Sequence, residues 1–468
     1  MSGSTETPLR VAIVGAGPSG FYAAEELLQS GRPVEVTMME RLPVPFGLVR
    51  SGVAPDHPKL KLPMLVYDRI ARSPGFHFFG NVHVGHDVAL ADLLRTHHAV
   101  VFACGAECDR RLGIPGEDLA GSHSATEFVG WYNGHPDYRA RSFDLSHPVA
   151  VIVGQGNVAL DVARMLAKPV DLLRTTDIAE HALEALASSR IVDIHIVGRR
   201  GPAQASFTGQ ELNELGGIPD CAVIVDPREL VLNGASQAEA ADKMSRNTVK
   251  NLEILGRWAS LPPQQAARRI HLHFFKSPKA VLGETHVEGV RFAQTVLHGE
   301  PFSQTAQDTD ERFDIACGLL FRSIGYRASA LEGLVFDDAR GVLRHQDGRL
   351  IDAHGQPLYG CYATGWIKRG ANGIIGTNRA DSVATVATLL ADIERLTQAP
   401  RGGAAALAAD LTARGKQFVT YDDWLRIDAR EVERGKAKGK PREKLTAVQT
   451  MLDVCGPTAA RPPAMQAA

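Results

Sequence analysis

Two stretches of the chain repeat one order of apolar and polar positions. Each begins with an apolar run, continues through a loop rich in glycine, and ends where alanine and leucine recur at helical spacing. This order predicts strand, tight turn and helix, the start of a parallel α/β sheet. The two stretches are "RVAIVGAGPSGFYAAEELLQSG" (residues 10–31) and "HPVAVIVGQGNVALDVARML" (residues 147–166).

The first turn carries Gly15, Gly17 and Gly20 in the spacing G-x-G-x-x-G. At this spacing the glycines permit a tight turn, close approach of the backbone to a pyrophosphate, and packing of helix on strand. The next predicted strand, residues 34–40, ends in Glu40, where a carboxylate accepts hydrogen bonds from the hydroxyls of an adenosine ribose. A glycine turn that binds nothing is the alternative. Because strand, glycines, helix and acid occur in order, we favour a dinucleotide with an unphosphorylated ribose.

The second turn has Gly154 and Gly156, with Ala159 at the third position, which needs only a small side chain. After a helical insertion, the following strand ends in "VGRR", so Arg199 and Arg200 stand where the first unit has its acid. Guanidinium groups suit the 2′-phosphate of NADP, and a solvated basic turn is the alternative. One loop for a flavin dinucleotide and one for NADPH predict an oxidoreductase that passes a hydride between two cofactors.

Composition excludes several other classes of protein. The chain has 468 residues, 44% of them hydrophobic. This length and composition allow two or three domains, each with its own hydrophobic core. A net charge of −2 without a basic patch excludes nucleic acid as a partner. No stretch approaches the roughly 18 apolar residues of a membrane span, and the polar N-terminus predicts a cytoplasmic location without membrane insertion. The six cysteines show no CxxC pair, so no metal or cluster site is expected.

Longer motifs are similar to one known family. "GAGPSG", "PFGLVRSGVAPDHPK", "GQGNVALD", "VGRR", "YATGWIKRGANGIIGTNRADS" and "GKPREK" together resemble the NADPH:adrenodoxin reductase family, including its bacterial NADPH:ferredoxin reductase members. The resemblance implies an α/β fold with two Rossmann-like domains, the NADP domain inserted into the FAD domain. The implied boundaries are 1–108 and 328–468 for FAD and 109–327 for NADP. The implied reaction is hydride transfer from NADPH to FAD, followed by transfer of single electrons to a ferredoxin-type iron–sulfur protein, with a downstream cytochrome P450 left open.

The resemblance also implies which residues bind each cofactor. Contacts with FAD are expected from both segments of its domain: Gly15, Ala16, Gly17, Gly20, Glu40, Leu48, Val84, Gly365, Trp366, Gly373, Ile374 and Ile375. Contacts with NADP are expected mostly from the inserted domain: Arg110, Gly154, Gln155, Gly156, Asn157, Val158, Arg199, Arg200, Glu211 and Gly373.

Three further residues are assigned roles at the nicotinamide by this resemblance. His57 is implied to face the nicotinamide and to pair with Glu214, with an ordinary packed histidine as the alternative. Trp366 replaces the aspartate that such flavoproteins usually have after Gly365, and is expected to cover the flavin or fill part of the nicotinamide site, unless it is a core tryptophan. A helix near residues 373–375 is expected to aim its N–H groups at the flavin pyrimidine ring.

The partner surface and the acceptor are less fixed by the sequence. Arg50, Lys59 and Lys61 form either a cationic rim for an acidic carrier protein or ordinary solvated side chains. The basic run at 434–444 is expected to be exposed, with an interaction element as a further interpretation, and an amphipathic helix is expected over 443–454 after it. The alternatives for function are a diaphorase, a reductase component of the glutamate synthase small-subunit type, which would bring cysteine-rich motifs, and a flavin-binding redox sensor.

Overall fold

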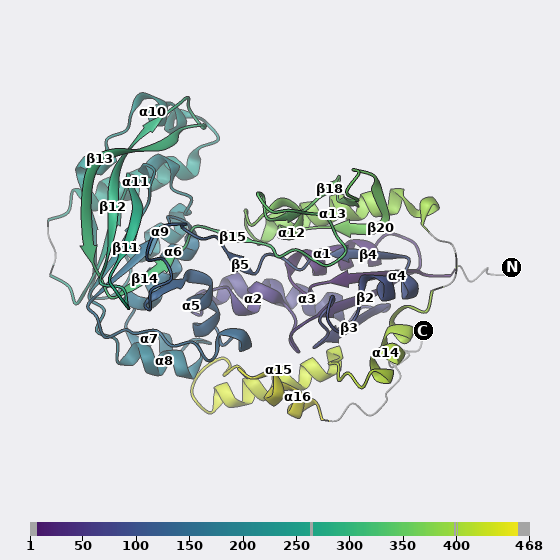
Figure 1. Cartoon of the computed structure of the whole chain (residues 1–468). Helices are drawn as coiled ribbons and strands as arrows, with labels where there is room; N and C mark the ends of the chain where they lie inside the picture. The colour runs from purple at the N-terminus through teal and green to yellow at the C-terminus, as the bar shows by residue number, and fades with distance from the viewer. Residues whose placement is uncertain (1–6, 263–264, 397–398, 400, 457–468) are drawn as a thin grey trace. The chain divides into compact units, whose positions relative to one another are not determined.

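The computed structural model describes residues 7–262, 265–396, 399 and 401–456, which divide into two compact units (Figure 1). Unit 1 consists of the described residues of Met1–Val53, His57–Cys108 and Tyr326–Ala468, and unit 2 consists of those of Ala54–Asp56 and Asp109–Gly325. The chain therefore passes from unit 1 into unit 2 after Cys108 and returns to unit 1 at Tyr326. The predicted architecture, one α/β unit inserted into another, is confirmed.

Unit 1 is built on a seven-stranded sheet in the order β18-β19-β20-β4-β1-β2-β3. Its central strands are parallel, and β18 and β19 are added antiparallel at one edge. Successive residues of β1 enter two different hydrophobic clusters, because protein covers both faces of the sheet. The strands are β1 (Leu9–Val14), β2 (Val34–Glu40), β3 (Phe76–Gly80), β4 (Ala99–Phe102), β18 (His345–Gln346), β19 (Arg349–Ile351) and β20 (Pro357–Ala363).

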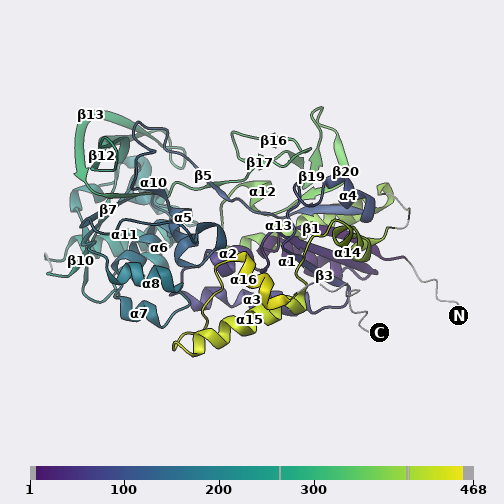
Figure 2. The same cartoon turned by 60° about the horizontal axis from the view of Figure 1, so that its bottom comes forward.

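Helices cover this sheet, and the C-terminal pair α15 and α16 lie side by side (Figure 2). Trp424 and Met451 of this pair share a cluster with Tyr67 of α3, so α15 and α16 pack against the first segment of the unit. The helices are α1 (Pro18–Leu28), α2 (Gly47–Ser51), η1 (Pro58–Lys61), α3 (Pro63–Ala71), α4 (Leu90–Thr96), α12 (Trp366–Arg369), α13 (Ile375–Ala391), η5 (Ile393–Arg395), α14 (Gly403–Ala413), α15 (Tyr421–Lys436) and α16 (Val448–Cys455). Short strands complete the unit: β16 (Phe336–Asp337) and β17 (Val342–Leu343), with β5 (Cys108–Asp109) and β15 (Tyr326–Arg327) where the chain crosses over.

Unit 2 is built on a six-stranded parallel sheet in the order β6-β14-β7-β8-β10-β9. The three-stranded antiparallel sheet β11-β12-β13 packs Val290 and Phe292 against Val151 and Val153 of β7. The strands are β6 (Ser122–Ser124), β7 (Val149–Val153), β8 (Asp193–Val197), β9 (Cys221–Val225), β10 (Arg268–His273), β11 (Lys276–Leu282), β12 (Gly289–His298), β13 (Thr305–Ala316) and β14 (Leu319–Arg322).

The opposite face of this sheet packs against helices in the largest cluster of the unit. In α6, the central helix of that cluster, Leu160, Val162, Ala163 and Leu166 are all buried, as its pattern of alanine, valine and leucine predicts. These side chains fix α6 on the sheet, so the start of the helix is held at the end of β7, where the second glycine loop lies. The helices are α5 (Ala125–Tyr132), η2 (Pro136–Tyr138), α6 (Asn157–Ala167), α7 (Val170–Arg174), α8 (Glu180–Ala187), η3 (Pro202–Gln204), α9 (Gly209–Leu215), η4 (Pro227–Leu230), α10 (Gly234–Ala241) and α11 (Arg246–Ala259).

The basic run at 434–444 is partly buried, so the prediction that it is exposed is wrong for Lys440, Glu443 and Lys444. Lys440, Glu443 and Lys444 are 4%, 3% and 3% exposed. The fully buried carboxylate of Glu431 accepts hydrogen bonds from Arg50 Nη2 at 2.5 Å and from Arg442 at 3.1 Å. Because these charges compensate one another, the run folds against α2 instead of projecting into solvent.

The same contacts correct the expected cationic rim. Arg50 is 6% exposed, pairs with Glu431 and lies 5.0 Å from the centre of the Trp424 ring. Lys61 is 7% exposed, and Lys59 is exposed. Two of the three cations are therefore part of the interior of unit 1. The final amphipathic helix is present, but it begins at Val448 rather than at residue 443.

Three histidines form a stack on β8 and β10 of unit 2. The His195 ring lies 4.4 Å from the His271 ring and 5.2 Å from the His273 ring, and His195 Nδ1 is 2.9 Å from His273 Nε2. Asp193 binds both His271 and Arg269. Burial, followed by the neighbouring His271, lowers the pKa of His195 to about 3 and that of His273 to about 4. Both imidazoles are therefore neutral in the folded protein at pH 7.

We expect acid to destabilise the protein through this stack. Because the folded-state pKa values lie below the ordinary value of 6.5, the unfolded chain binds protons first, and stability present above about pH 6.5 is lost as the pH falls towards 4. Each imidazole accounts for about 2 kcal/mol of this loss between pH 7 and pH 5, so the pair accounts for about 4 kcal/mol. Denaturant unfolding at pH 7 and at pH 5 measures this difference in the free energy of unfolding. The double variant His195→Gln/His273→Gln should lose less stability between the two pH values than wild type does. The control variant, His286→Gln at an exposed position, should behave like wild type. If the double variant loses as much stability as wild type, the histidine stack is not the source of the loss.

Candidate functional site

The first glycine loop joins β1 to α1 in unit 1. Gly15 has φ +105°, and a Cβ there would lie 2.7 Å from the Ala103 carbonyl oxygen. A Cβ at Gly20 would overlap the Gly15 oxygen. At Gly17, by contrast, no atom of the described residues outside its immediate chain neighbours lies within 4 Å of a Cβ position. Gly15 and Gly20 are thus required by packing, whereas Gly17 leaves a backbone surface that a pyrophosphate can approach.

Glu40 ends β2 beside this loop, as predicted. Its Oε2 accepts the Ala16 N–H at 3.1 Å, and its Oε1 accepts the Leu42 N–H at 3.2 Å. Burial raises the pKa of this carboxyl, against the effect of the two backbone hydrogen bonds. Each carboxylate oxygen has a second lone pair, so the fixed side chain can accept further hydrogen bonds from a ribose.

The returning segment of unit 1 presents Trp366 after β20. Its Nε1 donates to the Asn372 carbonyl oxygen at 3.1 Å, and its ring stacks on Tyr326 with 5.5 Å between ring centres. The half-buried indole is therefore held from two sides, but one part of it still faces out of the core. This position agrees with both sequence-based interpretations of Trp366, as a core residue and as a cover for a ligand.

A helix does begin where the sequence predicts one, with Ile375 as the first residue of α13. Gly373 has φ +79°, and the side chain of Ile374 is 68% exposed, which leaves an open apolar surface at the helix N-terminus. The N–H of Ile374 donates to the Thr377 hydroxyl at 3.2 Å. Thr377 therefore competes with any ligand for one of the N–H groups that were expected to face the flavin.

Sequence reasoning missed Asp381, which lies on α13. Its carboxylate accepts the Gly365 N–H at 2.5 Å and pairs with Lys368 Nζ at 2.8 Å. Trp366 stands directly after Gly365, where such flavoproteins usually have an aspartate, and the carboxylate that binds the Gly365 N–H comes from α13 instead. Asn378, one turn earlier, accepts a hydrogen bond from Ser19 of α1 at 3.1 Å and so ties the return segment to the first loop.

The two remaining residues predicted to bind FAD differ in exposure. Leu48 of α2 is 40% exposed, and Val84 is 9% exposed. A ligand can therefore contact the side chain of Leu48, whereas the side chain of Val84 is almost fully buried and leaves mainly its backbone groups for a ligand.

The second glycine loop joins β7 to α6 in unit 2 and repeats the first. Gly154 has φ +134°, and a Cβ there would overlap the Ser323 carbonyl oxygen. Gly156 has no described atom, other than those of its chain neighbours, within 4 Å of a Cβ position, and Ala159 is fully buried against the sheet. As in the first loop, one glycine, Gly154, is required by close packing, whereas another, Gly156, leaves the backbone open to a ligand.

Polar side chains hold this second loop in place. Gln155 Nε2 donates to the His273 carbonyl oxygen at 2.8 Å, and Asn157 Oδ1 accepts the Thr208 N–H at 2.8 Å. Both residues were expected to bind NADP, and their side chains are used in shaping the loop. Their backbone N–H groups, with that of Val158, lie at the N-terminus of α6, where an anion is favoured.

Arg199 and Arg200 follow β8 and are exposed. Arg200 Nη2 donates to the Gln204 carbonyl oxygen at 3.3 Å. Burial of part of the side chain, followed by repulsion from Arg199, lowers the pKa of Arg200, and the charge of Glu239 opposes this. Two adjacent cations that repel each other favour a bound dianion.

Arg200 also lines a cavity of about 210 Å³, together with Gln204, Glu239 and Phe302. Glu239 is 6% exposed, and its carboxylate accepts hydrogen bonds from Gln204 at 2.6 Å and Gln304 at 2.8 Å. This acid was not expected from the sequence. Its charge is engaged by the two amides, so the arginine pair keeps its positive character.

The remaining residues predicted to contact NADP or to orient its nicotinamide lie in both units. Glu211 and Glu214 are on α9, three residues apart; Glu211 is 8% exposed and Glu214 half-buried. Arg110 is exposed, and its N–H donates to Gly325. His57, in unit 1, is half-buried at the start of η1. The pairing of His57 with Glu214 stays a prediction.

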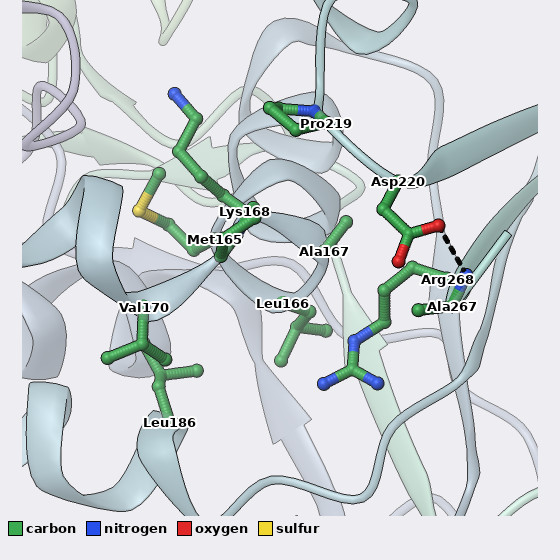
Figure 3. Close-up of a pocket in the computed structure, with 11 residues that line it drawn as sticks. Met165, Leu166, Ala167, Lys168, Val170, Leu186, Pro219, Asp220, Ala267 and Arg268 are labelled. Carbon is green, nitrogen blue, oxygen red and sulfur yellow. Dashed lines mark hydrogen bonds between the residues drawn. The ribbon is translucent and has the colours of Figure 1, made fainter.

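A second cavity, of about 220 Å³, lies at the C-terminal end of α6 (Figure 3). Met165, Leu166 and Val170 form much of its wall, and Arg268 reaches into it. Asp220 accepts the Ala267 N–H at 3.0 Å beside it. The glycine loop is at the other end of the same helix, so this cavity is separate from the expected nucleotide site.

Two sheets with parallel central strands, each with an open glycine before a helix, one with an acid and one with an arginine pair, define the class of two-dinucleotide oxidoreductases. Residues 13–79 match the NAD(P)-binding Rossmann-like domain family. Among the described residues, no helix combines the length and the apolar character that a membrane span needs.

Known proteins resemble the whole chain. NADPH:adrenodoxin oxidoreductase of Bos taurus is 44% identical over 465 residues, which cover 96% of this chain and 92% of the bovine protein. NADPH-ferredoxin reductase FprA of Mycobacterium tuberculosis is 42% identical over 459 residues, covering 96% and 99%. The solved structure of FprA in complex with NADPH matches with a TM-score of 0.90 at 41% identity, covering 96% of this chain and 99% of FprA. The chain therefore belongs to the family of NADPH:adrenodoxin oxidoreductases and NADPH-ferredoxin reductases, as its motifs predicted.

Proposed function

We propose that this chain is an NADPH:ferredoxin oxidoreductase that delivers electrons to a ferredoxin-type iron–sulfur protein. FAD, when bound, accepts a hydride from NADPH and releases electrons one at a time to such a carrier. The observation that carries the proposal is the pair of open glycine loops with opposite adenosine contacts, Glu40 at one and Arg199 with Arg200 at the other. The cytoplasmic location expected from the sequence stays a prediction.

We assign FAD to unit 1, and the bounds of this unit support the boundaries expected for the FAD domain, 1–108 and 328–468. The open backbone at Gly17 and the helix N-terminus behind it receive the pyrophosphate. Glu40 accepts the ribose hydroxyls. The N-terminus of α13, with the exposed Ile374 beside it, receives the pyrimidine end of the flavin and favours negative charge there.

We assign NADPH to unit 2, for which the expected boundaries are 109–327. The open backbone at Gly156 and the start of α6 receive the pyrophosphate, and the arginine pair receives the 2′-phosphate. His57 and Glu214 orient the nicotinamide for transfer. Hydride transfer needs no acid or base on the protein, so these two side chains act through position and polarity.

Anaerobic titration of the purified yellow protein tests this function. One equivalent of NADPH is expected to bleach the flavin absorbance, and NADH at the same concentration should do so far more slowly. Addition of an oxidised ferredoxin should then restore the colour as the ferredoxin is reduced. If a dye restores the colour but no ferredoxin does, the protein is a diaphorase; if NADPH leaves the flavin oxidised, the redox proposal fails.

A further inference from the structure

A buried cluster of charges lies in unit 2, centred on Arg164 of α6. Arg164 is 1% exposed, and its guanidinium holds Asp56 by two hydrogen bonds, Nε to Oδ2 at 2.7 Å and Nη2 to Oδ1 at 3.1 Å. Nη2 also donates to Asp161 at 2.5 Å, and Nη1 lies 3.4 Å from Glu211. Lys168 adds a further bond to Asp56 at 2.6 Å. Asp56 is thus held by a bidentate interaction with Arg164 and by a hydrogen bond from Lys168.

These contacts keep Asp56 charged in spite of its burial. Burial by itself would raise the pKa of Asp56, but hydrogen bonds and charges from Arg164 and then Lys168 lower it to about 2. Well-packed apolar side chains often stabilise a protein as well as a buried ion cluster does, while removal of one partner leaves an unpaired buried charge. A bidentate pair between Arg and Asp also fixes geometry, because it sets both distance and orientation.

The position of Asp56, directly before His57, links the hydrogen bonds of Asp56 to the placement of His57. Ala54–Asp56 belong to unit 2, although Val53 before them and His57 after them belong to unit 1. Asp56 is therefore the last residue of a short excursion, and His57 follows it directly. Pro55 and Pro58 flank this pair and restrict the backbone, so the direction in which the chain leaves Asp56 has little freedom.

The helix that carries Arg164 is also the helix of the second glycine loop. α6 begins at Asn157, so Arg164 lies about two turns after the loop. The loop and Arg164 are thus joined by one helix, most of whose residues are buried from Ala159 onward. The distance between the loop and Asp56 is thereby fixed as well.

We infer that Arg164 and Asp56 are positioning residues for hydride transfer, which orient His57 by anchoring the residue before it on the NADPH-binding helix. This inference rests on the proposed role of His57. Neither Arg164 nor Asp56 is among the residues assigned above to a cofactor. The pair acts through His57, and its loss should therefore appear in the rate of transfer rather than in nucleotide affinity.

The test is stopped-flow reduction of the FAD-loaded enzyme by NADPH in Asp56→Asn and Arg164→Lys variants. Asp56→Asn keeps the shape of the side chain, and Arg164→Lys keeps the charge but loses the fork. We expect each to slow flavin reduction by about ten- to a hundredfold, with less than about a threefold change in the Kd of NADPH. Arg174→Lys, at an exposed ion pair of α7 in the same unit, is the control and should match wild type.

A double variant separates this role from a merely structural one. If the pair acts through His57, the double variant Asp56→Asn/His57→Gln is no slower than His57→Gln alone. Multiplied losses, or a fall in flavin content and melting temperature that accounts for the slower rate, would overturn the inference. If His57→Gln by itself reduces as fast as wild type, the role of His57 fails and the inference fails with it, whereas the titration with NADPH and ferredoxin still decides the proposed function.

Discussion

Replacement of Arg199 and Arg200 by alanine is expected to reduce the preference for NADPH over NADH by roughly a hundred- to a few thousandfold. A hydrogen bond to a charged group contributes about 1.5 to 3 kcal/mol, so two guanidiniums on one phosphate contribute about 3 to 5 kcal/mol after screening by solvent. The structure adds a reason, because burial and repulsion from Arg199 lower the pKa of Arg200, and a bound dianion relieves that repulsion. The loss should appear mainly as a higher KM for NADPH.

The measurement is kcat/KM for both nucleotides in wild type and the double variant, at low and high salt. NADH lacks the 2′-phosphate, so its kcat/KM should change little. The wild-type preference should shrink as salt rises, since exposed charge pairs are screened. Arg190→Ala, just before β8, is the control for a lost surface charge. A wild type that prefers NADH, or a double variant that keeps its discrimination, would show that "VGRR" binds a different group.

The two nucleotide loops were predictable because everything that they require is contiguous in the sequence. Strand, glycines and helix follow one another, and Glu40 ends the next strand of the same local unit. The structure adds the distinction between the glycines. Gly15 and Gly154 have positive φ and close backbone neighbours, whereas Gly17 has room for a side chain that a bound phosphate would exclude.

The contacts that escaped prediction join residues far apart in the chain. Glu431 and Arg50 are 381 positions apart, and Arg164 and Asp56 are 108 apart. A charged residue looks solvent-exposed in a sequence, because charged side chains are rarely buried without a partner and the partner is not visible there. The basic run at 434–444 was misread for this reason. The expected pairing of His57 with Glu214 came from the family resemblance rather than from a local pattern, and it stays a prediction.

Gly17→Val is expected to yield a folded protein that binds FAD more than about a hundredfold more weakly than wild type. The backbone at Gly17 is extended, with φ −88° and ψ −174°, which valine adopts readily. No described atom beyond its chain neighbours stands in the way of the new side chain. The side chain would instead occupy the space of the pyrophosphate, whose charge-assisted hydrogen bonds to backbone N–H groups would be lost.

The matched variant in the other loop, Gly156→Val, gives this prediction its control. Gly156 is also extended and open, so the fold should persist, FAD should remain at about one per chain, and NADPH binding should be lost. Gly15→Ala marks the opposite case, because φ +105° and a backbone oxygen 2.7 Å away should prevent unit 1 from folding. Flavin absorbance per chain, NADPH affinity and far-UV circular dichroism separate the three outcomes. If Gly17→Val retained its flavin, or if Gly156→Val lost FAD and kept NADPH, the two loops would have been assigned to the wrong cofactors.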